Sequence, residues 1–205
     1  ERIRRGEHAE FVQKRLAEAA ASYREAMTSA RHPIQSAYAR LLLARVLEKS
    51  GDESQARNHY RALLPLPSNL ADEQGMPVWL YAASRLVKAR SGREEVLKRL
   101  RGEAEALVWR SPVVAHLVRD LAEALAQSLP GVGPQAEAQA LARTVIAALG
   151  QIEQALALQR DFASLGLGDA RTEAAQNKEP LWIPYGEDPW LVSVARQPGT
   201  LPTLV

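Results

Sequence analysis

Between residues 37 and 70, apolar and small side chains recur every three or four positions, in two successive runs. This spacing predicts two amphipathic helices that face one another. Gly51 suits the left-handed position that ends a helix, and Asp52 can cap the next helix with Gln55 as its capping-box partner. The residues expected to meet across the hairpin are Leu43, Ala44, Leu47, Ala56, Tyr60, Leu63 and Leu64. One hairpin cannot bury its own apolar face, so we expect helical neighbours on either side.

Helical periodicity continues on both sides of this hairpin. The predicted helices cover residues 7–29, 77–90, 93–106, 112–129 and 134–165. In the first of them, Ala19, Tyr23 and Ala26 share a face with Phe11. The segment 65–77 holds three prolines and a glycine, which predicts a loop that either packs as an ordered cover or carries a contact.

The character of the sequence changes at Gly166. A polar segment there predicts a linker, and the alternation through Trp190–Ala195 is typical of a β-strand. Thr200–Val205 is expected as a second strand after a turn at 197–199. The prediction is a mainly α protein of stacked antiparallel helical hairpins, an α-solenoid or bundle, with a small C-terminal β element. Its expected domains are helical repeats over 1–107, a helical bundle extension over 108–165, and the linker with the β element over 166–205.

The amino-acid composition argues against several classes of function. Among 205 residues, 46% are hydrophobic and 5% aromatic, so Ala and Leu must supply most of the core. The 26 Lys and Arg and 24 Asp and Glu residues are well mixed, which argues against a nucleic-acid-binding surface. Without cysteine there is no disulfide or thiolate metal site, and the lack of cysteine suits an oxidising compartment. No run of 18 apolar residues predicts a membrane span.

The 34-residue segment 37–70 resembles a tetratricopeptide repeat (TPR). The matching positions are Leu43-Ala44, Leu47, Gly51-Asp52, Ala56, Tyr60, Leu63 and Pro67. Arg40 stands where the repeat has Trp, and Leu63 stands where it has a small residue, so the repeat is degenerate. The resemblance implies helix-pair stacking and binding of a partner in a groove.

The order of parts also resembles the extracytoplasmic sensor region of bacterial membrane-bound sensor histidine kinases. The segments that carry the resemblance are Glu10-Phe11, Tyr23-Arg24, Leu41 to Leu47, Leu107-Val108-Trp109 and Trp190-Leu191-Val192. It implies a periplasmic module of an inner-membrane, homodimeric parent whose kinase domain lies elsewhere. Because the chain starts at Glu1 and ends on Leu204-Val205, we expect both ends to be cut from a longer protein.

The sequence contains no motif that marks a metal site or a catalytic nucleophile. The four histidines, His8, His32, His59 and His116, fall on different predicted helices without metal-ligand spacing, so no metal or cofactor is expected. No Gly-x-Ser-x-Gly elbow marks a nucleophile, and this fragment is expected not to be an enzyme.

The candidate site is a groove along the first helices of the stacked pairs. The residues expected to line it are Tyr38, Leu41, Arg45, Glu48, Lys49, Trp79 and Tyr81. An arginine beside aromatic side chains suits an anionic small ligand, a peptide or a protein.

Three functions remain open. The first is a noncatalytic signal-sensing module of a two-component kinase, and the second is a stand-alone TPR-type interaction scaffold, which also allows a cytoplasmic location. The third is an accessory part of a larger enzyme. The flanking coding sequence distinguishes them, since apolar segments of about 20 residues followed by a kinase support only the first.

Overall fold

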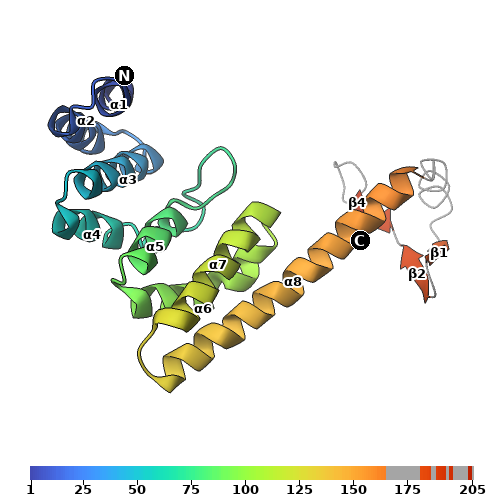
Figure 1. Cartoon of the computed structure of the whole chain (residues 1–205). Helices are drawn as coiled ribbons and strands as arrows, with labels where there is room; N and C mark the ends of the chain where they lie inside the picture. The colour runs from blue at the N-terminus through green and yellow to red at the C-terminus, as the bar shows by residue number, and fades with distance from the viewer. Residues whose placement is uncertain (165–180, 186–187, 193, 196–202, 205) are drawn as a thin grey trace. The chain divides into compact units, whose positions relative to one another are not determined.

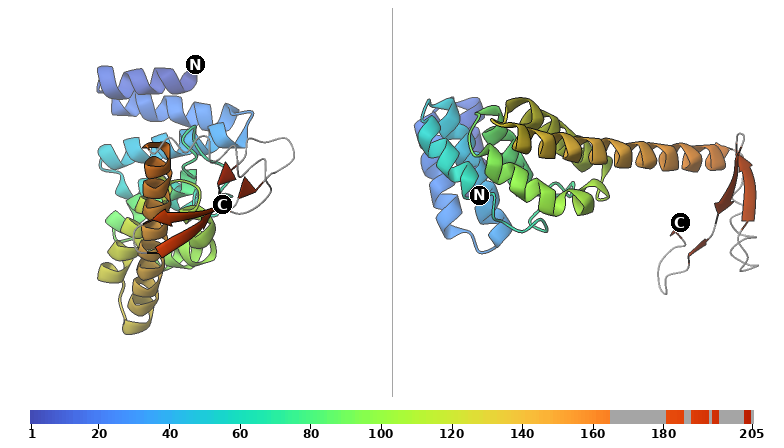
Figure 2. Two further views of the ribbon diagram at one scale, coloured as in Figure 1. Left: turned by 90° about the vertical axis from the view of Figure 1, so that its right-hand side faces the viewer. Right: turned by 90° about the horizontal axis from the view of Figure 1, so that it is seen from below.

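The protein is mainly helical, as the periodicity predicts. The computed structural model describes residues 1–164, 181–185, 188–192, 194–195 and 203–204. The helices in chain order are α1 (Arg2–Glu7), the π-helical turn η1 (His8–Val12), α2 (Leu16–Ser29), α3 (Pro33–Lys49), α4 (Glu53–Arg61), α5 (Val78–Lys88), α6 (Arg93–Val108), α7 (Pro112–Ser128) and α8 (Val132–Ser164). Figures 1 and 2 show α1 to α7 following one another as a series of neighbouring helices.

The chain divides into two compact units, Glu1–Gly150 and Gln151–Val205. This division differs from the domain boundaries that the sequence suggests at residues 107 and 165. In the second unit, β1 (Leu181–Tyr185) pairs antiparallel with β2 (Asp188–Val192), and β3 (Val194–Ala195) pairs antiparallel with β4 (Thr203–Leu204). The predicted linker over 166–178 and the turn at 197–199 lie outside the described residues.

The central hairpin forms as its sequence predicts. Gly51 adopts a φ of 85° after α3, a conformation that glycine reaches without a Cβ clash. Asp52 then caps α4, because its Oδ1 accepts a hydrogen bond of 3.1 Å from the backbone N–H of Gln55. The seven residues expected to face one another, Leu43, Ala44, Leu47, Ala56, Tyr60, Leu63 and Leu64, are all buried. Helix α2 packs on the other side of α3, so α3 has helical neighbours on both sides.

The single helix predicted over 7–29 is wrong. The chain breaks after η1, where Lys14 takes a left-handed φ of 57°, and then reverses so that α1 packs against α2. Ala19, Tyr23 and Ala26 are buried as expected, but Phe11 is 56% exposed. Periodicity missed the break because residues 7–29 contain neither proline nor glycine.

The reversal places a carboxylate inside the protein. The Glu10 side chain is fully buried, and its oxygens accept hydrogen bonds from Arg45 at 2.7 and 3.1 Å, Lys49 at 2.7 Å and the Tyr23 hydroxyl at 2.9 Å. Burial acts to raise the pKa of Glu10, but these three donors stabilise the ionised form and hold that pKa below its ordinary value. Burial and the bond to Glu10 raise the pKa of Tyr23. We call these four residues the Glu10 cluster; it fastens η1 to α2 and α3.

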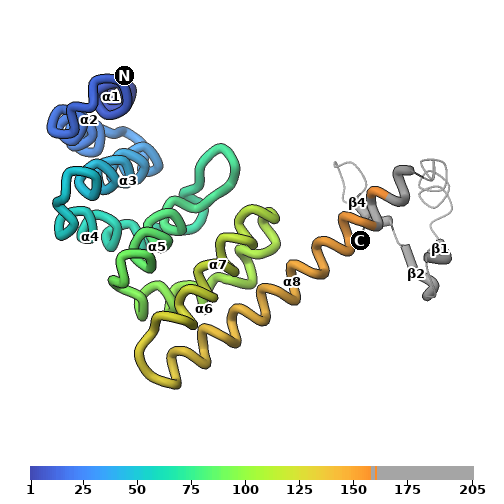
Figure 3. The backbone as a smooth tube through the Cα atoms, viewed as in Figure 1, coloured from blue at the N-terminus to red at the C-terminus, as the bar shows by residue number. Residues whose placement is uncertain are grey.

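The later helices of the first unit begin with ordinary caps. Ser111 accepts a hydrogen bond of 3.3 Å from the backbone N–H of Val114, and Pro112 occupies the first turn of α7. The first half of α8 buries one face, which consists of Ala138, Ala142, Val145 and Leu149. Arg101 of α6 pairs with Glu137 of α8 at 2.8 Å. The backbone tube in Figure 3 follows α6, α7 and this part of α8. None of the described helices is long and apolar enough to cross a membrane.

Two helical glycines give a matched test of the N-terminal packing. A Cβ added to Gly6 of α1 would come within 2.5 Å of the buried Tyr23 ring, whereas one added to Gly102 of α6 would meet nothing within 4 Å. Gly102→Ala should stabilise the protein by about 0.5–1 kcal/mol through helix propensity. Gly6→Ala should instead destabilise it by about 1–3 kcal/mol because of the clash. Urea unfolding measures both, and a stabilising Gly6→Ala would contradict the packing of α1 on α2.

The Glu10 cluster predicts a specific pH dependence. Glu10→Gln should lower the free energy of unfolding at pH 7 by about 3 kcal/mol, at the lower end for a broken buried ion pair because its cationic partners are partly exposed. The pKa of Glu10 is lower in the folded protein than the unfolded value near 4.5, so Glu10 contributes its full stabilisation above about pH 4.5. This stabilisation is lost as the pH falls through the folded pKa. The difference between wild type and Glu10→Gln should therefore shrink below pH 4.5.

Glu18→Gln is the control for this measurement, because Glu18 pairs with Arg15 on the exposed surface of the same segment. It should change stability little at any pH. Equal effects of the two substitutions in urea titrations would show that the Glu10 cluster does not hold the segment.

Candidate binding groove

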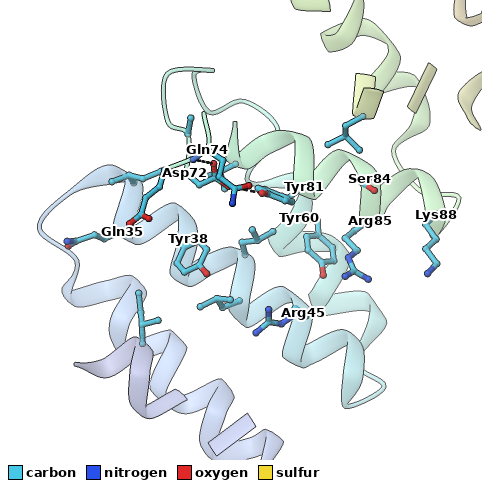
Figure 4. A pocket seen from close by; sticks show the side chains of 18 residues that line it. Gln35, Tyr38, Arg45, Tyr60, Asp72, Gln74, Tyr81, Ser84, Arg85 and Lys88 are labelled. Carbon is cyan, nitrogen blue, oxygen red and sulfur yellow. Dashed lines mark hydrogen bonds between the residues drawn. The ribbon is translucent and has the colours of Figure 1, made fainter. Parts of the chain in front are cut away.

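A groove of about 1270 Å³ runs between α3, α5 and the loop that precedes α5. Its lining consists of Ile3, Ile34, Gln35, Tyr38, Leu41, Leu42, Arg45, Tyr60, Ala71, Asp72, Glu73, Gln74, Val78, Tyr81, Ser84, Arg85, Lys88 and Leu117. Figure 4 shows the three tyrosines between the loop residues and the basic residues of α5. We call it the α3–α5 groove.

The α3 wall combines apolar side chains with one aromatic ring. Tyr38, Leu41 and Arg45 lie on one face because they are three or four residues apart on the helix. The Tyr38 side chain is 39% exposed, and no hydrogen bond to its hydroxyl is found among the described residues. Arg45 is committed to the Glu10 cluster and also lies 5.0 Å from the Phe11 ring centroid. Tyr38 is therefore the group of this wall best placed to meet a ligand.

The α5 wall carries the remaining positive charges. Tyr81, Arg85 and Lys88 follow one another at one-turn intervals and all line the groove. Arg85 lies 3.8 Å from Glu48, which also accepts a hydrogen bond of 2.9 Å from Tyr60. Lys88 is exposed, and no partner for its ammonium group occurs in the described part of the chain.

The loop closes the acidic end of the groove. Asp72 accepts hydrogen bonds of 2.9 Å from the backbone N–H groups of Gln74 and Met76 and one of 2.7 Å from the Tyr81 hydroxyl. Burial acts to raise the pKa of Asp72, but these hydrogen bonds stabilise its ionised form and lower that pKa. Burial and the bond to Asp72 raise the pKa of Tyr81 to about 12. Glu73 is exposed at the same end and has no partner among the residues described.

The back of the loop is fastened to α5 and α6. Trp79 donates a hydrogen bond of 2.8 Å from Nε1 to Ser68, whose hydroxyl also bonds Glu103. Arg99 donates to the carbonyl oxygens of Leu64 and Leu66, and its guanidinium lies 4.5 Å from the Trp79 ring centroid. The segment 65–77 is thus an ordered cover, one of the two roles that its composition suggested.

The sequence placed four of its seven candidate residues in the groove. Tyr38, Leu41, Arg45 and Tyr81 line it, whereas Glu48, Lys49 and Trp79 do not. Trp79 is 0% exposed and points into the core, so the expectation that it extends the binding surface is wrong. Lys49 binds Glu10 instead, and Glu48 is held by Tyr60 and Arg85 outside the lining.

Sequence reasoning missed four charged groove residues. Asp72 and Glu73 lie in a loop, whose path no periodicity describes. Arg85 and Lys88 had a usable signal, because they stand four and seven residues after Tyr81 and so share its helix face.

The groove offers hydroxyl, amide and charged groups above an apolar floor. Such a mixture is typical of binding sites in which a few polar groups fix the orientation of a ligand. Among the described residues, no group of three His, Cys, Asp or Glu side chains is arranged to hold a metal ion. Comparisons with family models, curated proteins and solved structures found no match to this chain.

The Asp72 contacts predict local protection of the loop. Asp72→Ala should release the amides of Gln74 and Met76, each of which loses a charge-assisted bond worth about 1.5–3 kcal/mol. Their hydrogen exchange should accelerate at least about tenfold, since a tenfold change corresponds to about 1.4 kcal/mol. Glu73→Ala is the matched control, and it should leave both rates unchanged. Equal exchange in wild type and Asp72→Ala would exclude Asp72 as the organiser of the loop.

Proposed function

We propose that this chain is a noncatalytic binding module that takes a ligand or partner in the α3–α5 groove. The observation that carries the proposal is the groove itself, which joins an apolar floor to three tyrosines and charged groups at its ends. Partly exposed aromatic rings favour binding because they bury a large area at low entropic cost.

The groups that line the groove support binding more than chemistry. Asp72 is already engaged by two backbone amides and Tyr81, and Arg45 is engaged by Glu10. Within the described lining, Ser84 has no histidine beside it that would serve as a general base. These side chains hold the walls in place, and Tyr38 and Lys88 have free polar groups that face a ligand.

The second part of the proposal concerns the larger protein to which this module belongs. The degenerate TPR-like hairpin and the C-terminal Trp-Leu-Val segment support a sensor region of a two-component histidine kinase, in which ligand binding biases the packing of the helices. The stand-alone interaction scaffold is the alternative, and the flanking coding sequence decides between them.

A matched pair of aromatic substitutions tests the groove. Compounds and short peptides are first selected because they raise the melting temperature of the wild type. Their binding to the wild type, Tyr38→Ala and Trp109→Ala is then measured by calorimetry. Both residues are exposed aromatics, with Trp109 at 58%, but only Tyr38 lines the groove. Tyr38→Ala should weaken binding about tenfold or more, because a stacked ring contributes about 1–2 kcal/mol.

The Trp109→Ala variant should bind each ligand with an affinity within about twofold of the wild type, because Trp109 does not line the groove. Ligands that bind both variants as tightly as the wild type would place the site elsewhere. The absence of any stabilising compound or peptide would count against a binding module. Arg45 is unsuitable for this test, because its removal would also unpair the buried Glu10 carboxylate.

A further inference from the structure

The charges of the α3–α5 groove are separated along α5. The loop end carries Glu73 beside the engaged Asp72, and the other end carries Arg85 and Lys88. Figure 4 shows Asp72 and Gln74 near Tyr81, with Arg85 and Lys88 progressively farther along the helix. Opposite charges at two ends of one groove select the orientation of a ligand as well as its identity.

Both ends keep charge that the protein does not neutralise within itself. Glu73 and Lys88 have no ion-pair partner among the described residues, and the Arg85–Glu48 contact is long at 3.8 Å. Arg45, by contrast, is neutralised by Glu10 at 2.7 Å. Among the described residues, the unpaired charges are therefore Glu73 at the loop end and Lys88 at the other end, where Arg85, loosely paired with Glu48, adds a second positive charge.

The size of the groove favours an extended chain over a compact molecule. Its volume of about 1270 Å³ is larger than the roughly 300–1,000 Å³ of common small-molecule pockets. A floor of aliphatic side chains bordered by tyrosine hydroxyls and the amides of Gln35 and Gln74 suits a peptide, which alternates side chains with backbone donors and acceptors.

The length of the α5 wall follows from helix geometry. Tyr81, which is bonded to the loop end, and Lys88 are seven residues apart on α5, a rise of about 10 Å at about 1.5 Å per residue. An extended peptide covers about 3.3 Å per residue, so this distance corresponds to about three residues.

Resting on the proposed function, we infer that the groove binds an extended polypeptide segment with one basic and one acidic residue at a fixed separation of a few positions. The acidic side chain pairs with Arg85 and Lys88, and the basic side chain pairs with Glu73. The aliphatic floor and Tyr38 receive the residues between them.

Fluorescence anisotropy with synthetic peptides tests this inference. The probes are labelled nine-residue peptides, capped at both ends, that place one Asp and one Lys in a Ser, Thr and Leu background. Their separation ranges from one to seven positions, in both orders. Affinity should peak at one separation within this range and in one of the two orders, and it should fall as salt is added.

Lys88→Glu supplies the charge test, because Lys88 has no partner in the described structure whose loss would disturb folding. It should weaken the best peptide about fivefold or more, and replacing the Asp of that peptide by Lys should recover part of the affinity, because Arg85 remains at the same end. Glu73→Lys should give the reciprocal result with a peptide whose Lys is replaced by Asp. Lys98→Glu, an exposed lysine of α6 outside the groove lining, is the matched control and should have no effect.

Affinity that does not depend on separation, or a loss in Lys88→Glu that the altered peptide does not rescue, would overturn the inference. If only small compounds bind and Tyr38→Ala weakens them, the inference fails while the proposed function stands. If neither peptides nor compounds bind through Tyr38, both fail.

Discussion

The constraint on which the first unit depends is the burial of the Glu10 carboxylate. An ionised group without exposure to water is tolerated only where donors replace its hydration, and here Arg45, Lys49 and Tyr23 do so. These donors come from α2 and α3, so the carboxylate can be satisfied only when η1 is folded against both helices. One charge thus determines where the N-terminal segment reverses.

The same requirement determines what the groove can offer. Because Arg45 must neutralise Glu10, its charge is not available to a ligand even though its side chain lines the groove. The positive potential that a ligand meets then comes from Arg85 and Lys88 on the opposite wall. The pairing of Arg45 with Glu10 therefore leaves Arg85 and Lys88 of α5 as the positively charged end of the groove.

The sequence predicted the parts whose structure is decided locally. Gly51, Asp52 and Gln55 specify the α3–α4 turn within five residues, and Ser111-Pro112 specifies the start of α7. It also predicted Tyr38, Leu41 and Tyr81 as groove residues, because a helix places such spacings on one face.

The misses share a physical cause, which is pairing between residues far apart in the chain. Glu10 meets Arg45 and Lys49 over 35 and 39 positions, and nothing near Glu10 announces this contact. Trp79 is expected from the sequence to line the groove beside Tyr81, but it is buried, with its N–H bonded to Ser68 and Arg99 over its ring. Periodicity identifies which residues share a face; it does not say which face a distant partner covers.

The supports of the groove lie behind its walls. On the α3 side the Glu10 cluster fixes the helix from behind, and on the loop side Ser68, Trp79 and Arg99 fix the cover from behind. Several lining side chains are themselves engaged in these supports, since Asp72 bonds Tyr81 and two amides and Arg45 pairs with Glu10. The walls are therefore ordered before a ligand binds, so binding would not carry the entropic cost of ordering them. Arg45, Asp72 and Tyr81 both line the groove and fasten its walls, so substitutions there would change its geometry. Under the proposed function, substitutions at Tyr38, Glu73 or Lys88 would instead change direct contacts with a ligand.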